Sequence, residues 1–147
     1  MSRNGPSASL TRADHEFVDH TSEVILRLRA PSYPELIGEA TSAFAELVPP
    51  HKIGRPSDEW REFRFDGPTD RVGRLVDWLN ELVYLCDVDQ WLPVEVEVDD
   101  VAGAELHIRA RGVDLDEPFV LVKAATLQNA FVHERAGGVE GEVTLDV

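Results

Sequence analysis

The stretch from Asp70 to Asp87 constrains the fold of this chain more than any other part of the sequence. Apolar residues recur in it at three- and four-residue spacing, which is typical of a helix with one buried face. The residues of this stripe are Val72, Leu75, Val76, Trp78, Leu79, Leu82, Val83, Leu85 and Cys86. The spacing also predicts a solvent-facing side made of Arg74, Asp77, Glu81 and Tyr84. So broad an apolar face needs a cover, and a sheet is the natural one.

A second helix is predicted from 32 to 48. Ser32 is a suitable N-cap, Glu35 completes a capping box, and Pro34 fits the first turn. The helix that starts near residue 70 is expected to follow a turn at 67–70, with Asp70 as its cap. Alternating apolar and polar residues predict strands at 16–20, 23–30, 60–65, 94–98, 105–111, 127–134 and 139–147, with loops at 49–59 and 112–118. Since several strands follow one another without a helix between them, we expect mostly antiparallel pairing and an α+β class.

Composition narrows the classes of function. The 147 residues include 28 acidic and 14 basic side chains, a net charge of -14, which disfavours a nucleic-acid-binding surface. We expect one domain at 15–147 after a flexible tail at 1–14. The N-terminal segment does not resemble a signal peptide, and no apolar run is long enough to span a membrane. The single cysteine, Cys86, is expected to be a buried, inert thiol in a cytoplasmic protein.

Two polar stretches are candidates for a site. The sequence has no phosphate-binding glycine loop, nucleophile elbow or zinc motif. Asp19-His20-Thr21-Ser22-Glu23 precedes a buried strand, and Asp146-Val147 ends the chain. Each stretch alone is explained by a solvated turn or a charged end. If the strands beside them meet, however, Glu23, Asp146 and the terminal carboxylate converge, and such oxygens suit Ca²⁺ or Mg²⁺.

Several motifs, in this order, resemble those of the archease family. The segment D-H-T-S-E-V (19–24) is similar to the family's D/E-H-T-A-D-V/I motif, and L-V-D-W-L-N-E-L-V-Y-L-C-D (75–87) is similar to its W-L-x-E-L-L-Y-L-F-D helix. V-K-A-A-T (122–126) resembles its V-K-A-V-T segment. The closing L-D-V (145–147) matches the family's ending on an aspartate and an aliphatic residue. The resemblance covers residues 16–147.

The resemblance implies a small α+β protein that binds a divalent cation and has no enzymatic reaction of its own. Archeases activate RtcB-type RNA ligases, which use GTP and Mn²⁺ in tRNA splicing and RNA repair, by promoting guanylylation of a histidine on the ligase. It implies a calcium site, with magnesium or manganese as alternatives, at Glu23, Asp146 and Val147. The residues expected to orient this site or to contact the partner are Asp19, His20, Thr21, Lys123 and Gln128.

The sequence departs from the family's pattern at the polar positions. Glu23 replaces an aspartate, Gln128 replaces a histidine, and the segment around Gly112 lacks the family's glutamate. These differences leave an alternative, a binding or chaperone-like module that keeps the scaffold and has lost the activating site. A hydrolase built on Asp19, His20 and Glu23 is disfavoured, because the sequence indicates no positioned nucleophile.

Overall fold

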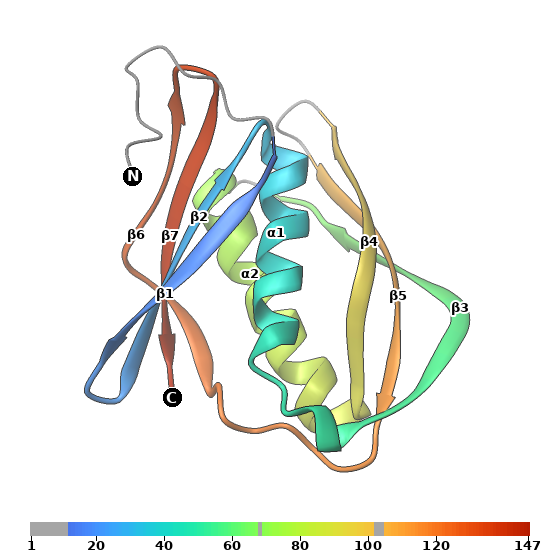
Figure 1. Ribbon diagram of the computed structural model, residues 1–147. Helices are drawn as coiled ribbons and strands as arrows, with labels where there is room; N and C mark the ends of the chain where they lie inside the picture. Colours follow the sequence, from blue (N-terminus) through green and yellow to red (C-terminus); the bar gives the residue numbers. More distant parts are fainter. Residues whose placement is uncertain (1–11, 68, 102–104) are drawn as a thin grey trace.

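The fold is α+β, as predicted, with two helices packed with two antiparallel sheets (Figure 1). The computed structural model describes residues 12–67, 69–101 and 105–147. Most of the predicted tail, residues 1–11, therefore lies outside the described residues, as do residues 68 and 102–104.

One sheet joins strands from both ends of the chain, and the other is built from its middle. The four-stranded sheet has the order β1-β2-β7-β6, and the three-stranded sheet has the order β3-β5-β4. All neighbours within each sheet are antiparallel. The strands are β1 (Asp14–His20), β2 (Glu23–Ala30), β3 (Ile53–Phe65), β4 (Trp91–Val101), β5 (Glu105–Leu115), β6 (Ala124–Arg135) and β7 (Gly138–Asp146).

The helices α1 (Tyr33–Glu46) and α2 (Arg71–Tyr84) lie between the two sheets (Figure 1). Trp78 of α2 is fully buried at the centre of this layer. Its indole N–H donates to the Thr41 hydroxyl of α1 at 2.8 Å. Phe63 and Phe65 of β3 meet its ring edge-on, with centroids 5.3 and 6.1 Å away. One side chain thus joins both helices to the three-stranded sheet.

Both helices begin at the predicted caps. The Ser32 hydroxyl accepts from the backbone N–H of Glu35 at 3.3 Å and donates to the Glu35 carboxylate at 2.9 Å. The Asp70 carboxylate accepts from the backbone N–H of Gly73 at 2.9 Å. α2 ends at Tyr84, earlier than predicted, and one wider, π-helical turn (Leu85–Asp89) follows it.

The predicted position of Arg74 on the solvent side of α2 is wrong. Its side chain is buried, with only 6% of the residue exposed. The guanidinium donates to the backbone carbonyls of Asp66 and Gly67 at 3.2 and 2.8 Å. Helical periodicity could not show this, because the turn before the helix folds back and supplies the acceptors.

The two loops predicted at 49–59 and 112–118 are largely strand. β3 already begins at Ile53, but its register shifts twice before Trp60, so the alternation of side chains is broken. β5 continues through Gly112 to Leu115. A Cβ at Gly112 would lie 2.2 Å from the carbonyl oxygen of Leu92, so only glycine allows the strands to approach this closely.

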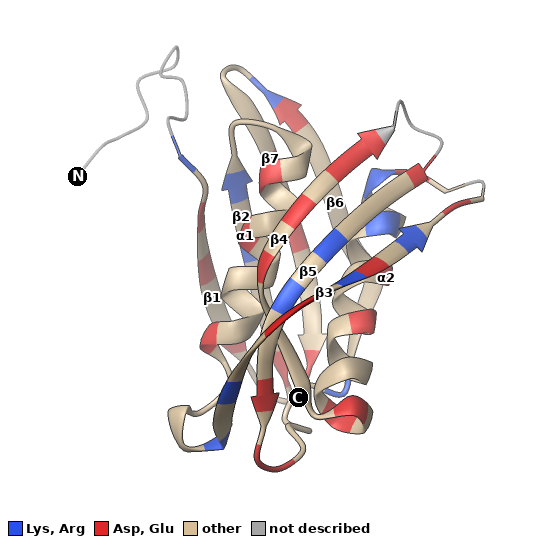
Figure 2. Ribbon diagram, turned by 90° about the vertical axis from the view of Figure 1, so that its right-hand side faces the viewer, with Lys and Arg blue, Asp and Glu red and all other residues tan. Residues whose placement is uncertain are grey.

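The outer face of the three-stranded sheet carries two cross-strand ion pairs. Glu95 lies opposite Arg111 and Glu97 opposite Arg109, and each pair is in contact. Figure 2 shows the basic row of β5 beside the acidic row of β4. Both guanidinium groups also stack on Trp60 of β3, at 4.7 and 4.9 Å from the ring centroid. Exposed pairs of this kind stabilise weakly, but they favour one register of the strands.

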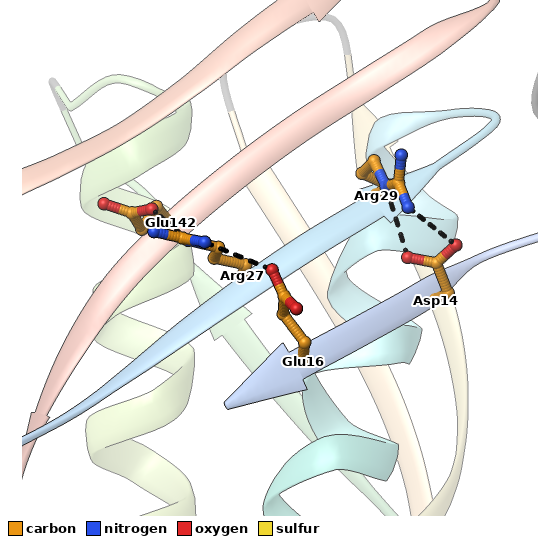
Figure 3. A network of polar contacts seen from close by, with 5 residues as sticks. All are labelled: Asp14, Glu16, Arg27, Arg29 and Glu142. Atoms are coloured by element: carbon orange, nitrogen blue, oxygen red, sulfur yellow. Dashed lines mark hydrogen bonds and ion pairs between the residues drawn. The ribbon is translucent and has the colours of Figure 1, made fainter. Parts of the chain in front are cut away.

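The outer face of the four-stranded sheet has a comparable network (Figure 3). Arg27 of β2 bridges Glu16 of β1 at 3.2 Å and Glu142 of β7 at 3.0 Å. Arg29 contacts Asp14 at 3.3 Å. These contacts join three strands on the surface that faces away from the helices, and they favour the register that pairs β2 with β7.

Cys86 is fully buried, as predicted, and burial raises the pKa of its thiol to about 12. The thiol is therefore protonated and unreactive at neutral pH. In the part of the chain that the structure describes, no helix is long and apolar enough to cross a membrane.

His15 links the edge strand β1 to α1 through two contacts with glutamates, and we expect the strength of these ion pairs to depend on pH. Its Nδ1 lies 2.6 Å from a Glu39 oxygen and its Nε2 lies 2.9 Å from a Glu46 oxygen. Burial lowers the pKa of the imidazole, but hydrogen bonds to Glu39 and Glu46 outweigh it and the pKa is raised. The ion pairs of His15 therefore stabilise the fold fully below the pKa of about 6.5 that histidine has in the unfolded chain. This stabilisation is lost as the pH rises through the higher pKa of His15 in the folded protein.

Unfolding in denaturant at several pH values between about 6 and 8 would measure this effect. The difference in the free energy of unfolding between the wild type and His15→Gln should shrink as the pH rises. A difference that stays constant over this range would contradict the ion-pair account.

Candidate functional site

The sheet register brings the two predicted carboxylates together. Glu23, the first residue of β2, lies directly opposite Asp146, the last residue of β7. Next to them, the backbone N–H of Val147 donates to the Ser22 carbonyl at 3.1 Å. Because that pair is hydrogen-bonded, Glu23 and Asp146 form the adjacent non-hydrogen-bonded pair, in which Cα atoms are about 4.5 Å apart and side chains are close.

Both carboxylates lie on the outer face of the sheet, where they are exposed to solvent. Leu26 and Leu145 belong to the inner face, so the strand alternation places Glu23 and Asp146 on the outer one. His20 pairs with Glu23 across the β1–β2 turn and shares this face. Asp19 pairs instead with Val24, on the opposite face. The structure therefore separates Asp19 from the carboxylates near which the sequence placed it.

Thr21, Lys123 and Gln128, the other residues predicted for the site, lie at different distances from the carboxylate pair. Thr21 is exposed in the β1–β2 turn, where Ser22 has a φ of 63°. Lys123 is exposed, and its backbone N–H donates to the Asp146 carbonyl at 2.7 Å. Gln128 is exposed in β6, within the register shift between Thr126 and Phe131. Thus Lys123 lies next to the carboxylate pair, whereas Gln128 lies in the irregular part of β6.

Asn80 positions this end of the sheet, a role that the sequence analysis did not assign. Its side-chain amide donates to the Ala125 carbonyl at 3.0 Å and accepts from the Ala125 N–H at 2.9 Å. Ala125 follows Ala124, which pairs with Asp146. In the sequence, Asn80 is noticeable only as a polar residue within the apolar stretch of α2. The fold is needed to show that its hydrogen-bond partner is the backbone of Ala125.

Glu23 and Asp146 present their carboxylate oxygens side by side at this end of the sheet. Within residues 12–67, 69–101 and 105–147, no group of three or more His, Cys, Asp or Glu side chains could hold a metal ion. Glu23 and Asp146 are thus a pair of neighbouring carboxylates and not a complete metal site by themselves. Two like charges directly opposite each other destabilise a sheet unless a cation lies between them. Carboxylate oxygens are the ligands that Ca²⁺ and Mg²⁺ prefer.

A separate groove of about 430 Å³ lies between α1 and β4. Its lining is mixed, with Glu35 and Glu39 of α1 on one side and Val94, Val96 and Val98 of β4 on the other. The predicted site residues do not line it, so the groove and the carboxylate pair are distinct features.

Comparison with known proteins gives consistent matches along nearly the whole chain. Residues 15–147 match the model of the archease protein family. Protein archease of Methanosarcina barkeri is 30% identical over 142 residues, covering 90% of this chain and 95% of that protein. Protein archease of Methanopyrus kandleri is 29% identical over 140 residues, covering 90% of this chain and 98% of that protein.

Two solved structures share the fold. The solution structure of Methanobacterium thermoautotrophicum protein 1598 has a TM-score of 0.66 at 23% identity and covers 90% of this chain and 98% of its own. The crystal structure of a Thermotoga maritima archease, described as a possible chaperone, has a TM-score of 0.61 at 20% identity and covers 88% and 94%. At these identities the likeness establishes the architecture.

Proposed function

This chain belongs to the archease family, and we propose that it is an accessory protein that activates an RtcB-type RNA ligase in the cytoplasm. The activity is promotion of ligase guanylylation, and so of turnover, in tRNA splicing or RNA repair. The observation that supports the proposal is the pairing of Glu23 with Asp146 beside the Val147 terminus. This pairing brings together two of the motifs on which the resemblance rests, residues 19–24 and residues 145–147.

We propose that Glu23, Asp146 and the Val147 carboxylate bind a divalent cation, with calcium preferred and magnesium or manganese as alternatives. When bound, the cation supplies positive charge that can orient phosphate groups. The carboxylates face outward, so a partner can approach them without unfolding the sheet. His20 shares their face, and Thr21 and Lys123 flank them, where they can contact the partner or its nucleotide.

Asp19 and Gln128 have a more distant role in this proposal. Asp19 lies on the opposite face of the sheet at the same turn, and Gln128 lies in the irregular part of β6. Both are exposed, so they are assigned to partner contact rather than to cation binding.

A guanylylation assay tests the proposed function. A cognate RtcB-type ligase should be guanylylated faster, and should turn over more often, with this protein than without it. An equal rate of guanylylation with and without this protein, at saturating GTP and Mn²⁺, would contradict the proposed activation of the ligase.

The alternative is a binding or chaperone-like module that keeps the scaffold without the activating site. It is favoured by Glu23, whose side chain is one methylene longer than the family's aspartate, and by Gln128 in place of histidine. Calorimetric titration with Ca²⁺, Mg²⁺ and Mn²⁺ discriminates the two, because the alternative predicts that none of these cations binds.

A further inference from the structure

One side of β4 has no partner strand. The three-stranded sheet has the order β3-β5-β4, so within the part of the chain that the structure describes β4 pairs only with β5. Over residues 95–101 its register with β5 is continuous, and this stretch contains no proline, lysine or bulge, the features by which proteins often block an edge strand. The backbone groups on the unpaired side of residues 95–101, which we call the β4 edge, are therefore available to another strand.

The groove between α1 and β4 lies beside the β4 edge. Val94, Val96 and Val98 line it, and because they alternate along the strand they face inward together. On the α1 side the lining includes two small residues, Gly38 and Ser42. Val94 is 47% exposed, so the groove is open to solvent. A strand added to the β4 edge would direct every second side chain toward this groove.

The two elements that form the groove carry only acidic charges. Neither α1 nor β4 contains a lysine or an arginine. Glu35 and Glu39 line the groove. On the outer face of β4, Glu95 and Glu97 contact arginines of β5, and Asp99 is exposed. Figure 2 shows this acidic row along β4, on the side of the sheet away from β3. A strand beside β4 is therefore favoured if its charged side chains are basic.

Two of these carboxylates take part in no ion pair among residues 12–67, 69–101 and 105–147. One is Glu35, whose carboxylate accepts from the Ser32 hydroxyl. The other is Asp99, which lies opposite His107, but the imidazole Nε2 of His107 contacts Glu105 instead. A basic side chain on an added strand would lie beside Asp99 and supply the cation that β5 does not.

The same charges disfavour a second copy of this chain at the β4 edge. Two copies that paired through β4 would place the acidic residues of one against those of the other, and like charges in opposite positions destabilise a sheet. The occupant that fits has basic residues where β4 has acidic ones, and small apolar residues where β4 has valines.

We propose that the β4 edge binds an extended, basic segment of another protein, in which lysine or arginine alternates with small apolar residues. The segment adds a fourth strand to the sheet, its apolar side chains enter the groove between α1 and β4, and its basic side chains lie beside Glu97 and Asp99. This binding requires neither the cation site nor the RNA ligase, so it goes beyond the proposed function.

A labelled eight-residue peptide of alternating lysine and valine is the probe, and fluorescence anisotropy measures its binding. The wild type should bind it and should not bind a peptide of alternating glutamate and valine. Two further peptides carry methyl groups on the backbone nitrogens of either the lysines or the valines. One of them should bind at least tenfold more weakly and the other nearly as well as the probe, because an added strand pairs through only one of its sides. Equal losses in both would contradict strand addition.

Three variants of the protein locate the site. Ser42→Leu fills the groove from α1 with a residue that favours helix, and Asp99→Lys reverses the charge at the β4 edge. Each should weaken binding of the lysine–valine peptide by tenfold or more. Asp77→Lys, the same charge reversal at an exposed residue of α2 outside the groove, is the matched control and should bind nearly as well as the wild type. Unfolding curves should show that all three variants are folded. Unchanged binding in both site variants, or equal losses in all three, would overturn the proposal.

Two other occupants of the β4 edge are distinguished in the full-length chain. Residues 1–11 contain Arg3 and no acidic residue, so the chain itself supplies a basic segment. If Arg3→Glu strengthens binding of the peptide tenfold, residues 1–11 compete for the edge and a partner protein as its occupant is overturned. If the wild type is a dimer that Ser42→Leu converts to monomers, a second copy covers the edge and the proposal is likewise overturned. None of these measurements uses the ligase, so their failure leaves the proposed function unchanged.

Discussion

Trp78→Ala should lower the free energy of unfolding by about 3–5 kcal/mol, which is a large share of the 5–15 kcal/mol typical of a whole domain. The substitution removes a fully buried indole and leaves a cavity between the two helices and β3. It also removes the donor of the hydrogen bond to Thr41. The two helices that surround Trp78 can move into the cavity only in part, so most of the loss in the free energy of unfolding remains.

Denaturant unfolding, followed by circular dichroism, measures the loss. Trp78→Phe should cost less, about 1–2 kcal/mol, because it keeps a ring against Phe63 and Phe65 and loses mainly the hydrogen bond. Trp60→Ala is the matched control, since that ring is only partly buried beneath two arginines and its removal should cost about 1 kcal/mol. Equal losses at Trp60 and Trp78 would show that Trp78 is not the centre of the core.

Glu23→Gln and Asp146→Asn should each weaken binding of the divalent cation by about 10- to 100-fold, the range found even for residues one shell further from a metal. Each substitution removes one of the two negative charges that the register brings together and that we propose as ligands. Ligase activation should fall in parallel. Glu23→Asp restores the family's residue and should retain both binding and activation. Calorimetry with Ca²⁺ and the guanylylation assay measure the two effects.

Stability gives a second readout that does not depend on the ligase. Without a cation, Glu23→Gln should stabilise the protein by about 0.2–1 kcal/mol, because it removes like charges from opposite positions in the sheet. With Ca²⁺ the order should reverse, since the wild type binds the cation more tightly and gains more binding free energy. Glu140→Gln, on the same face of β7 but at its other end, is the control and should show no reversal. A wild-type melting temperature that is insensitive to Ca²⁺, Mg²⁺ and Mn²⁺ would contradict the cation site.

Local signals were enough to predict much of the fold. The caps at Ser32 and Asp70 and the apolar stripe of α2 depend on residues within a few positions of one another, and the structure has them as predicted. β2 and β7 were also predicted, because their alternation is unbroken. Two bulges erased that signal in β3. Arg74 was misplaced because its acceptors are backbone carbonyls, which sequence periodicity does not show.

The site was harder to predict than the fold. The sequence named Glu23 and Asp146, but only the pairing of β2 with β7 shows that they are direct neighbours. Asp19 and Glu23 were grouped because they are close along the chain, yet strand alternation puts them on opposite faces. Asn80 could not be recognised without its partner, Ala125, which belongs to another element. Composition and the order of motifs do not show which segments, far apart in the sequence, come into contact in the fold.

The arrangement of the strands has a consequence for the order of folding. β3, β4 and β5 can pair as soon as the middle of the chain is available, whereas β2 needs β7, at the far end. Pairing between segments so distant in sequence is slow, because loop closure costs entropy before any contact forms. We therefore expect the edge of β2 to stay unpaired in the β1–β2 hairpin until β7 is available. An unpaired strand edge of this kind is a site where another chain can pair and aggregation can begin, so the pairing of β7 with β2 also protects the folded protein from aggregation.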